Sequence, residues 1–339
     1  MSKNVYPKAI KQVIRGRLIP EKELNSLNKW YPVEVTEEKG VLSTLWYFFG
    51  DFLFSQPFFY QSITQVPFEN RRICNLPFNS AKQLSKFDYV EPSAFIFHCS
   101  RCGSTLITQL LSLLSQCIVF SEPQVIDILL HLACFGQDKT KYGETLKTIM
   151  HAFGQKRSGK ECYLFVKLDC WHICHFQFIR SFFPNTPCFF LYRTPFEVLR
   201  SHRRERGAHM VPGILAPEIV GLNPADQWNF TDLDRYGINV LTSYFKAALS
   251  HNDLILMNYN QLPNVIWEEF ANFLSISFTK EEMERMKSRS SLHSKRSYER
   301  FVEKTDQGGE LPADMQVLNM LYNSLEHKRL NKNKRKYSG

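Results

Sequence analysis

A short run of basic, small and hydroxyl residues follows a buried apolar segment near residue 100. Ala94–Cys99 is expected to form a strand, Arg101-Cys-Gly-Ser-Thr105 a tight loop, and residues 106–114 the apolar face of a helix that opens at about Ser104. A loop between a strand and a helix start presents several backbone N–H groups and the positive end of a helix dipole to one point. With one guanidinium and two hydroxyls in the same run, the pattern predicts a binding site for phosphate or sulfate.

A second basic residue lies at the end of another predicted strand. Arg193 follows the aromatic run Phe189–Tyr192, Pro195 suits the first turn of a helix, and Ser201 lies two turns further on. In open parallel sheets, ligands bind at the carboxyl ends of the strands. An arginine fork and a hydroxyl that converge there suit a second phosphate.

The first loop does not fit a nucleoside-triphosphate site. That site needs G-x-x-x-x-G-K-[ST], and alignment on Gly103 puts His98 at the first glycine and Ser104 at the lysine. The remaining pattern resembles the 5′-phosphosulfate loop of sulfotransferases that use 3′-phosphoadenosine-5′-phosphosulfate (PAPS). The arrangement strand–Arg193-x-Pro–helix–Ser201 is similar to the 3′-phosphate motif of the same family. The resemblance spans roughly residues 93–275.

The resemblance implies a cofactor, a reaction and a set of ligands. The donor would be PAPS, and an acceptor hydroxyl would attack sulfur in line, with 3′,5′-adenosine bisphosphate leaving. Positioning and charge stabilisation would supply most of the acceleration. No metal is expected, because the sulfuryl group carries less charge than a terminal phosphoryl group and the Walker lysine is missing. The residues implied to bind the donor are Arg101, Cys102, Gly103, Ser104, Thr105, Arg193 and Ser201.

Four residues are candidates for catalysis. Glu122 follows the short apolar stretch Cys117–Phe120, and the resemblance to glutamate-base enzymes, such as tyrosyl-protein and carbohydrate sulfotransferases, makes it the expected base. Lys167, near the end of the predicted strand Cys162–Leu168, is expected to stabilise developing charge together with Arg101. Many cytosolic family members carry a histidine just after this lysine, where it would act as the base. This chain has Asp169 there, with His172 and His175 further on, so Asp169 is the alternative base. Glu122 next to Pro123 also fits an ordinary helix-start carboxylate.

These elements predict an α/β fold of three layers, with a mostly parallel sheet flanked by helices and related to P-loop NTPases. We expect a mainly helical N-terminal extension (1–90), a PAPS-binding core (91–275) and a helical C-terminal segment with a basic tail (276–339). Val41–Tyr60 is interpreted as an aromatic helical pair packed on the core, with a lid as the alternative. Ser294–Arg300 is a further, loosely matched candidate to close over the nucleotide.

Composition is consistent with a cytoplasmic enzyme. The 339 residues are 44% hydrophobic, and nine cysteines, an odd number, lie scattered through apolar segments, which favours reduced thiols over disulfides. The first residues show no signal peptide, and no apolar run is long enough to span a membrane. Zinc binding by Cys170, His172, Cys174 and His175 is conceivable, but a packed interior is favoured.

The net charge of +9 suits a multiply charged anion, and no nucleic-acid module is recognisable, so no specific nucleic-acid partner is expected. The acceptor class (carbohydrate, peptide tyrosine, lipid head group or small alcohol) and the oligomeric state stay open.

Two other functions remain open at this point. A kinase for a small molecule or nucleotide on a related sheet would need ATP and magnesium, and would bind ATP more tightly than 3′,5′-adenosine bisphosphate. A non-catalytic descendant acting as an interaction protein would have lost its anion ligands. Retention of the loop, Lys167, Arg193 and Ser201 argues against the latter.

Overall fold

The computed structural model describes residues 14–226, 231–295, 299 and 315–337, with side chains up to residue 331 in the last segment. Most of the segment 294–300, which is a candidate to close over the nucleotide, lies outside the described residues. The first thirteen residues, on which the expectation of no signal peptide was based, also lie outside them.

The main sheet has five parallel strands in the order β6-β7-β5-β8-β9, which confirms the α/β class. Nearly all of their residues are buried, as expected when helices cover both faces of a parallel sheet. The strands are β5 (Pro92–His98), β6 (Cys117–Ser121), β7 (Tyr163–Lys167), β8 (Cys188–Tyr192) and β9 (Ile255–Asn258).

The helices and turns connect and flank these strands. The α-helices are α2 (Phe59–Gln65), α3 (Phe78–Leu84), α4 (Ser104–Leu111), α5 (Gln124–Phe135), α6 (Lys139–Phe153), α7 (Phe176–Phe182), α8 (Pro195–Arg204), α9 (Leu233–Ser250), α10 (Ala271–Leu274), α11 (Lys280–Ser290) and α12 (Gln316–Tyr337). Short 3₁₀ turns are η1 (Glu21–Glu23), η2 (Phe68–Asn70), η3 (Cys170–His175), η4 (Ala208–Met210) and η5 (Tyr259–Gln261), and η6 (Ile266–Phe270) is a π-helix.

The elements around the predicted site form where the sequence indicated. Strand β5 is followed by a loop and by α4, which begins at Ser104, and β8 is followed by α8 with Pro195 in its first turn. Between β7 and β8 the chain forms first the 3₁₀ turn η3 and then α7. After β9 and η5, the π-helix η6 leads directly into α10.

The N-terminal region differs from the helical extension that we expected. It holds a sheet of order β1-β4-β3-β2, whose strands are β1 (Arg17–Leu18), β2 (Trp30–Glu38), β3 (Val41–Phe48) and β4 (Arg72–Pro77), and only α2 and α3 are helical. Strands β2 and β3 form a hairpin closed by Lys39 and Gly40, which both have positive φ. Two such residues make the turn that matches strand twist. The β-branched and aromatic residues of β3 favour a strand. For this reason the first part of Val41–Tyr60 forms β3 and not the helix that we expected.

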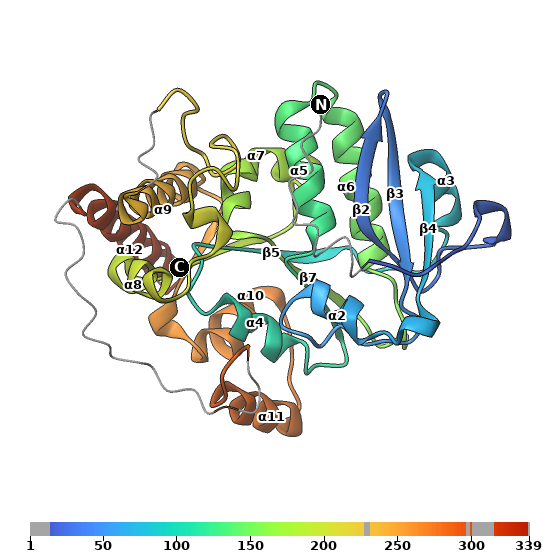
Figure 1. Cartoon of the computed structure of the whole chain (residues 1–339). Helices are drawn as coiled ribbons and strands as arrows, with labels where there is room; N and C mark the ends of the chain where they lie inside the picture. Colours follow the sequence, from blue (N-terminus) through green and yellow to red (C-terminus); the bar gives the residue numbers. More distant parts are fainter. Residues whose placement is uncertain (1–13, 227–230, 296–298, 300–314, 338–339) are drawn as a thin grey trace. The chain divides into compact units, whose positions relative to one another are not determined.

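The chain divides into two compact units. The first comprises Met1–Ala94, Thr108–Leu168 and Phe178–Thr186, and the second comprises Phe95–Ile107, Asp169–Gln177 and Pro187–Gly339. In the first unit, α5 and α6 pack beside β2 (Figure 1), and aromatic rings gather around Phe120, which stacks on Phe153 at 4.0 Å. In the second unit, α8, α9 and α12 lie side by side (Figure 1).

All nine cysteines fall in the described residues, and each is a free thiol. Among the described helices, none combines the length and the apolar character needed to cross a membrane.

Candidate functional site

The loop after β5 has an unusual backbone. Ser100, Arg101 and Gly103 have φ values of 69°, 50° and 83°, and positive φ is uncommon for residues other than glycine. A Cβ on Gly103 would lie 2.6 Å from Leu262 Cδ1 and 3.1 Å from the ring of Tyr259. The loop therefore turns tightly against the chain that follows β9, and glycine is required at position 103.

One buried thiol and one backbone N–H join this loop to the neighbouring strand. The Cys102 thiol donates to the carbonyl of Leu191 at 3.3 Å, and the Cys99 backbone N–H donates to the same carbonyl at 3.0 Å. Both cysteines are fully buried, and burial raises the pKa of the Cys99 thiol well above its ordinary value. The Cys102 side chain and the Cys99 backbone thus join the loop to β8, which ends one residue before Arg193.

The arginine of the loop reaches to the end of α8. The Arg101 guanidinium donates to Glu205 Oε2 at 3.2 Å and also to the Glu205 carbonyl. The Glu205 side chain is 79% exposed, and an ion pair with so exposed a partner contributes little stability. Ser104 and Thr105 are buried at the start of α4.

Arg193 is held between a carboxylate and an aromatic ring. Its Nε donates to Glu197 Oε2 at 2.8 Å, and its guanidinium carbon lies 3.9 Å from the centre of the Tyr259 ring. The hydrogen bond from Arg193 is the largest influence that lowers the pKa of Glu197, and the Thr194 hydroxyl donates to the same carboxylate at 2.8 Å. Ser201 lies further along α8.

Tyr259 brings the two predicted anion sites together within the second unit. Its ring faces Gly103 of the loop and also carries the Arg193 guanidinium. Strands β5 and β8 are parallel neighbours with His98 opposite Leu191, so the loop and Arg193 follow the carboxyl ends of adjacent strands. Adjacent strands lie about 4.8 Å apart. The pairing thus puts the two predicted anion-binding groups at neighbouring positions on one sheet edge.

Glu122 and Lys167 form an ion pair within the first unit. Lys167 Nζ lies 2.9 Å from Glu122 Oε1, and the Lys167 side chain is fully buried, whereas that of Glu122 is 22% exposed. Lys167 Nζ also lies 5.0 Å from the centre of the Phe58 ring. Glu122 has a φ of 50°, a conformation that costs a non-glycine residue of order 1 kcal/mol or more and that clusters at functional sites.

Asp169 lies after β7, at the start of η3 in the second unit. Its backbone N–H donates to Nδ1 of His172 at 3.2 Å, and its Oδ2 lies 3.8 Å from Nε2 of the same ring. The imidazole is 1% exposed, so the carboxylate of the alternative base faces a buried aromatic partner.

Three residues contact the arginines predicted to bind the donor but were not predicted from the sequence. They are Glu197, Glu205 and Tyr259. Glu197 lies four residues after Arg193 at a helix start, a spacing that allows an ion pair. Tyr259 directly follows β9, and the rule that ligands bind at the carboxyl ends of strands would have included it. Glu205 has no local signal, because it lies 104 residues from Arg101.

No family model matches the chain, and no curated protein matches it. Among solved structures, it is similar to the sulfotransferase STF9 from Mycobacterium avium, with 11% identity over 70% of this chain and 77% of that chain and a TM-score of 0.45. It is also similar to the sulfotransferase domain from the curacin biosynthetic pathway (16% identity, 57% and 77%, TM-score 0.35). A third similar structure is mouse sulfotransferase SULT7A1 complexed with PAP (13% identity, 62% and 68%, TM-score 0.35). We therefore base the function on the residues of this chain.

Proposed function

We propose that this protein transfers a sulfuryl group from PAPS to an acceptor hydroxyl. The observation that supports the proposal is that the loop after β5 and Arg193 after β8 follow adjacent parallel strands, with Tyr259 in contact with both. A nucleotide with phosphate groups at its 5′ and 3′ positions needs two anion-binding groups at neighbouring places. A ligand with phosphate groups at its 5′ position alone would need only the loop and would not require Arg193.

The residues present fit this donor. The loop from Arg101 to Thr105 offers N–H groups and two hydroxyls to a 5′-phosphosulfate, while Arg193 and Ser201 suit a 3′-phosphate. The absence of a side chain at Gly103 leaves the Tyr259 ring in contact with the loop backbone. When bound, the donor supplies a sulfuryl group activated by its anhydride bond to the 5′-phosphate.

The Glu122–Lys167 pair supplies the proton chemistry in this proposal. Glu122 accepts the proton of the acceptor hydroxyl as the new oxygen–sulfur bond forms and the bond from sulfur to the 5′-phosphate oxygen breaks. Once the Glu122 carboxylate is neutralised, the ammonium of Lys167 has lost its counter-charge, so it attracts the negative charge of the departing bisphosphate more strongly. Arg101 stabilises the sulfuryl oxygens, and Asp169 remains the alternative base.

Binding of the donor product tests the proposal without knowledge of the acceptor. Calorimetry should show that 3′,5′-adenosine bisphosphate binds more tightly than ATP with magnesium. Arg193→Ala should weaken binding of the bisphosphate by about 2–4 kcal/mol, because paired charge-assisted hydrogen bonds are lost. Arg204→Ala removes the same charge from an exposed position on α8 and is the matched control.

Three results would contradict the proposal. Tighter binding of ATP with magnesium would favour a kinase, and binding of neither nucleotide would favour an interaction protein. An unchanged affinity in Arg193→Ala would remove this residue from the site.

If 3′,5′-adenosine bisphosphate binds as expected, a second experiment identifies the acceptor class. Radiolabelled PAPS is incubated with carbohydrates, tyrosyl peptides, lipid head groups and small alcohols, and the labelled product shows which class accepts the sulfuryl group.

A further inference from the structure

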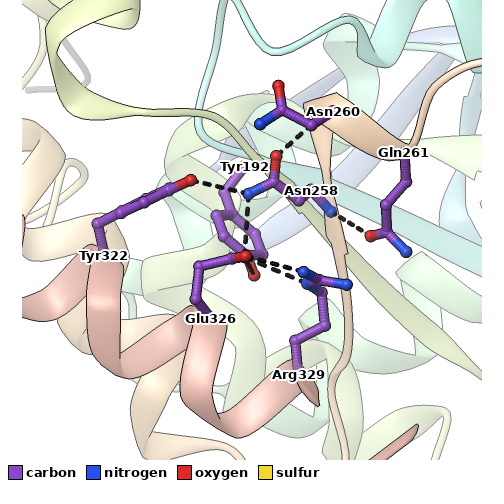
Figure 2. A network of polar contacts seen from close by, with 7 residues as sticks. All are labelled: Tyr192, Asn258, Asn260, Gln261, Tyr322, Glu326 and Arg329. Atoms are coloured by element: carbon purple, nitrogen blue, oxygen red, sulfur yellow. Dashed lines mark hydrogen bonds and ion pairs between the residues drawn. The ribbon is translucent and has the colours of Figure 1, made fainter.

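A single carboxylate of the C-terminal helix contacts the last residues of two core strands (Figure 2). Glu326 of α12 accepts a hydrogen bond from the hydroxyl of Tyr192, which ends β8. It also accepts one from the side-chain amide of Asn258, which ends β9, at 2.9 Å. Tyr192 and Asn258 are 0% and 2% exposed, so their polar groups depend on partners from the protein.

The charge of Glu326 is compensated from its own helix. Arg329 donates from Nη2 to Oε2 at 2.8 Å and from Nε to Oε1 at 3.2 Å (Figure 2). Burial alone would raise the pKa of Glu326, but hydrogen bonds from Arg329, Tyr192 and Asn258 outweigh it and keep that pKa below its ordinary value. The group therefore stays an acceptor for both strand ends.

Asn258 extends the same network into the turn η5. Its amide N–H also donates to the Tyr322 hydroxyl at 3.0 Å, and its Oδ1 accepts from the backbone N–H of Asn260 at 2.9 Å. The Asn258 backbone N–H donates to Gln261 Oε1 at 2.8 Å. These bonds (Figure 2) define the path of the backbone from Asn258 to Gln261, a segment that includes Tyr259 in the sequence.

The two strand ends that Glu326 joins precede two site residues. Tyr192 is followed by Arg193, and Asn258 is followed by Tyr259. The guanidinium carbon of Arg193 lies 3.9 Å from the centre of the Tyr259 ring. Tyr259 also contacts the anion loop at Gly103. One carboxylate thus connects the backbone under the guanidinium with the backbone under the ring that supports it.

We propose that Glu326 is a positioning residue for donor binding, which sets the Arg193 guanidinium on the Tyr259 ring so that it can hold a 3′-phosphate. The C-terminal helix then supports the donor site through the ends of β8 and β9. This inference rests on the proposed function, because it assigns the 3′-phosphate to Arg193.

A second anchor of α12 provides the control. Lys328 donates to the carbonyls of Leu249 and His251 at 3.0 and 2.8 Å, at the end of α9. Lys328→Met loosens the docking of the same helix without removing a bond to β8 or β9. A role confined to helix docking predicts similar effects at both anchors, whereas a positioning role predicts an effect at Glu326 alone.

The experiment compares calorimetric affinities for 3′,5′-adenosine bisphosphate and for adenosine 5′-monophosphate, whose ratio we call the 3′-phosphate advantage. Glu326→Ala should reduce the advantage at least about tenfold while affinity for the monophosphate stays within about threefold, because only the 3′-phosphate contact depends on Arg193. Glu326→Gln keeps an acceptor oxygen and should retain most of the advantage. Lys328→Met should leave it unchanged. Tyr192→Phe removes only a hydroxyl, should fold even if Glu326→Ala does not, and should lose part of the advantage.

An unchanged advantage in Tyr192→Phe and in any folded Glu326→Ala would overturn the inference, and so would an equal loss in Lys328→Met. A wild-type chain that binds the bisphosphate and the monophosphate equally would instead remove the 3′-phosphate from Arg193. That result refutes the proposed donor, and it is distinguishable because it appears before any substitution is made.

Discussion

Each of the three basic side chains assigned to the site has a carboxylate partner from its own chain. The pairs are Arg101 with Glu205, Arg193 with Glu197 and Lys167 with Glu122. A bound anion must compete with these partners, and the competition is weakest where the carboxylate is most exposed to water. Arg101, whose partner is 79% exposed, is thus the cation most readily turned toward a ligand, and the buried Lys167 is the least.

The buried pair yields a prediction for the base. Glu122→Gln should abolish sulfuryl transfer because an amide cannot accept the proton, while affinity for 3′,5′-adenosine bisphosphate should change little. The free energy of unfolding should fall by about 1–3 kcal/mol, because Lys167 keeps a hydrogen-bond acceptor but loses its charged partner. Radiolabel transfer, calorimetry and urea unfolding measure the three quantities.

Glu144→Gln is the matched control for this substitution. Glu144 pairs with Lys147 at 2.9 Å in the same unit, but both side chains are about two-fifths exposed, so the loss should stay below about 1 kcal/mol and turnover should persist. Unimpaired turnover in Glu122→Gln would instead assign the role of base to Asp169 or to a histidine.

A buried histidine on α8 predicts how stability depends on pH. His202 is 1% exposed, and its Nδ1 accepts the backbone N–H of Gly207 at 3.3 Å. Burial, followed by the charges of His209 and Arg101, lowers the pKa of His202 from 6.5 to about 2. The folded state therefore keeps the ring neutral where the unfolded chain binds a proton. The contribution of His202 to the free energy of unfolding is therefore fully present above pH 6.5, and it is lost progressively as the pH drops below that value.

Between pH 7 and pH 5, His202 alone should cost about 2 kcal/mol of unfolding free energy, at 1.36 kcal/mol per pH unit. His202→Asn can still accept the Gly207 N–H but does not titrate, so its loss over this interval should be smaller by that amount. Urea unfolding of both proteins at the two pH values measures the difference. Equal losses would mean that the ring does not stay neutral in the folded protein.

At the scale of elements, the loop after β5 depends on a glycine for two separable reasons. Gly103 has a φ of 83° and lies against Leu262 and Tyr259, whereas Gly40 has a φ of 81° and open space, with no atom within 4 Å of the place that a Cβ would take. Alanine at either position should cost about 1–2 kcal/mol of stability from backbone strain. Only Gly103→Ala should also displace the Tyr259 ring and weaken binding of 3′,5′-adenosine bisphosphate. Chemical unfolding and calorimetry on both variants separate the two effects, and equal binding in both would mean that the ring contact is unimportant.

The elements that could be predicted from the sequence are those with strong local signals. An apolar run, a glycine-containing turn and a proline in a first helical turn sufficed for β5, α4, β8 and α8. The hairpin of β2 and β3 was missed because the aromatic residues of β3 were assigned to a helix, although Lys39-Gly40 is a two-residue turn. Trp46 of β3, for example, is buried in a cluster with Leu27, Cys74 and Leu76, which lie outside the strand, and the local pattern of β3 does not contain these contacts.

The same limit explains which parts of the site the sequence indicated. Arginines and hydroxyls after strands follow a positional rule, so Arg101, Ser104 and Arg193 could be named in advance. The partners Glu205 and Tyr259 depend on contacts over more than sixty residues, as do the bonds between α12 and the strand ends. No spacing rule connects such positions before the fold is known.

At the scale of the whole molecule, the path of the chain links the two units. It passes from one unit to the other after Ala94, Ile107, Leu168, Gln177 and Thr186, and the first of these points lies inside β5. The division at Ala94 therefore assigns one part of β5 to each unit. A division of this kind differs from two domains joined by one linker, where each can unfold alone.

This path predicts one cooperative unfolding transition in calorimetry, with the calorimetric and van't Hoff enthalpies equal. The residues proposed to bind the donor, the loop 101–105 with Arg193 and Ser201, all lie in the second unit. If unfolding is a single transition, 3′,5′-adenosine bisphosphate at about 100 times its dissociation constant should nevertheless stabilise the whole chain by about 2.7 kcal/mol. Arg193→Ala, measured at the same ligand concentration, should lose most of that shift while keeping a single transition. Two transitions, of which the ligand moves only one, would show that the units unfold separately despite the shared strand, and would assign the moved transition to the unit that binds the nucleotide.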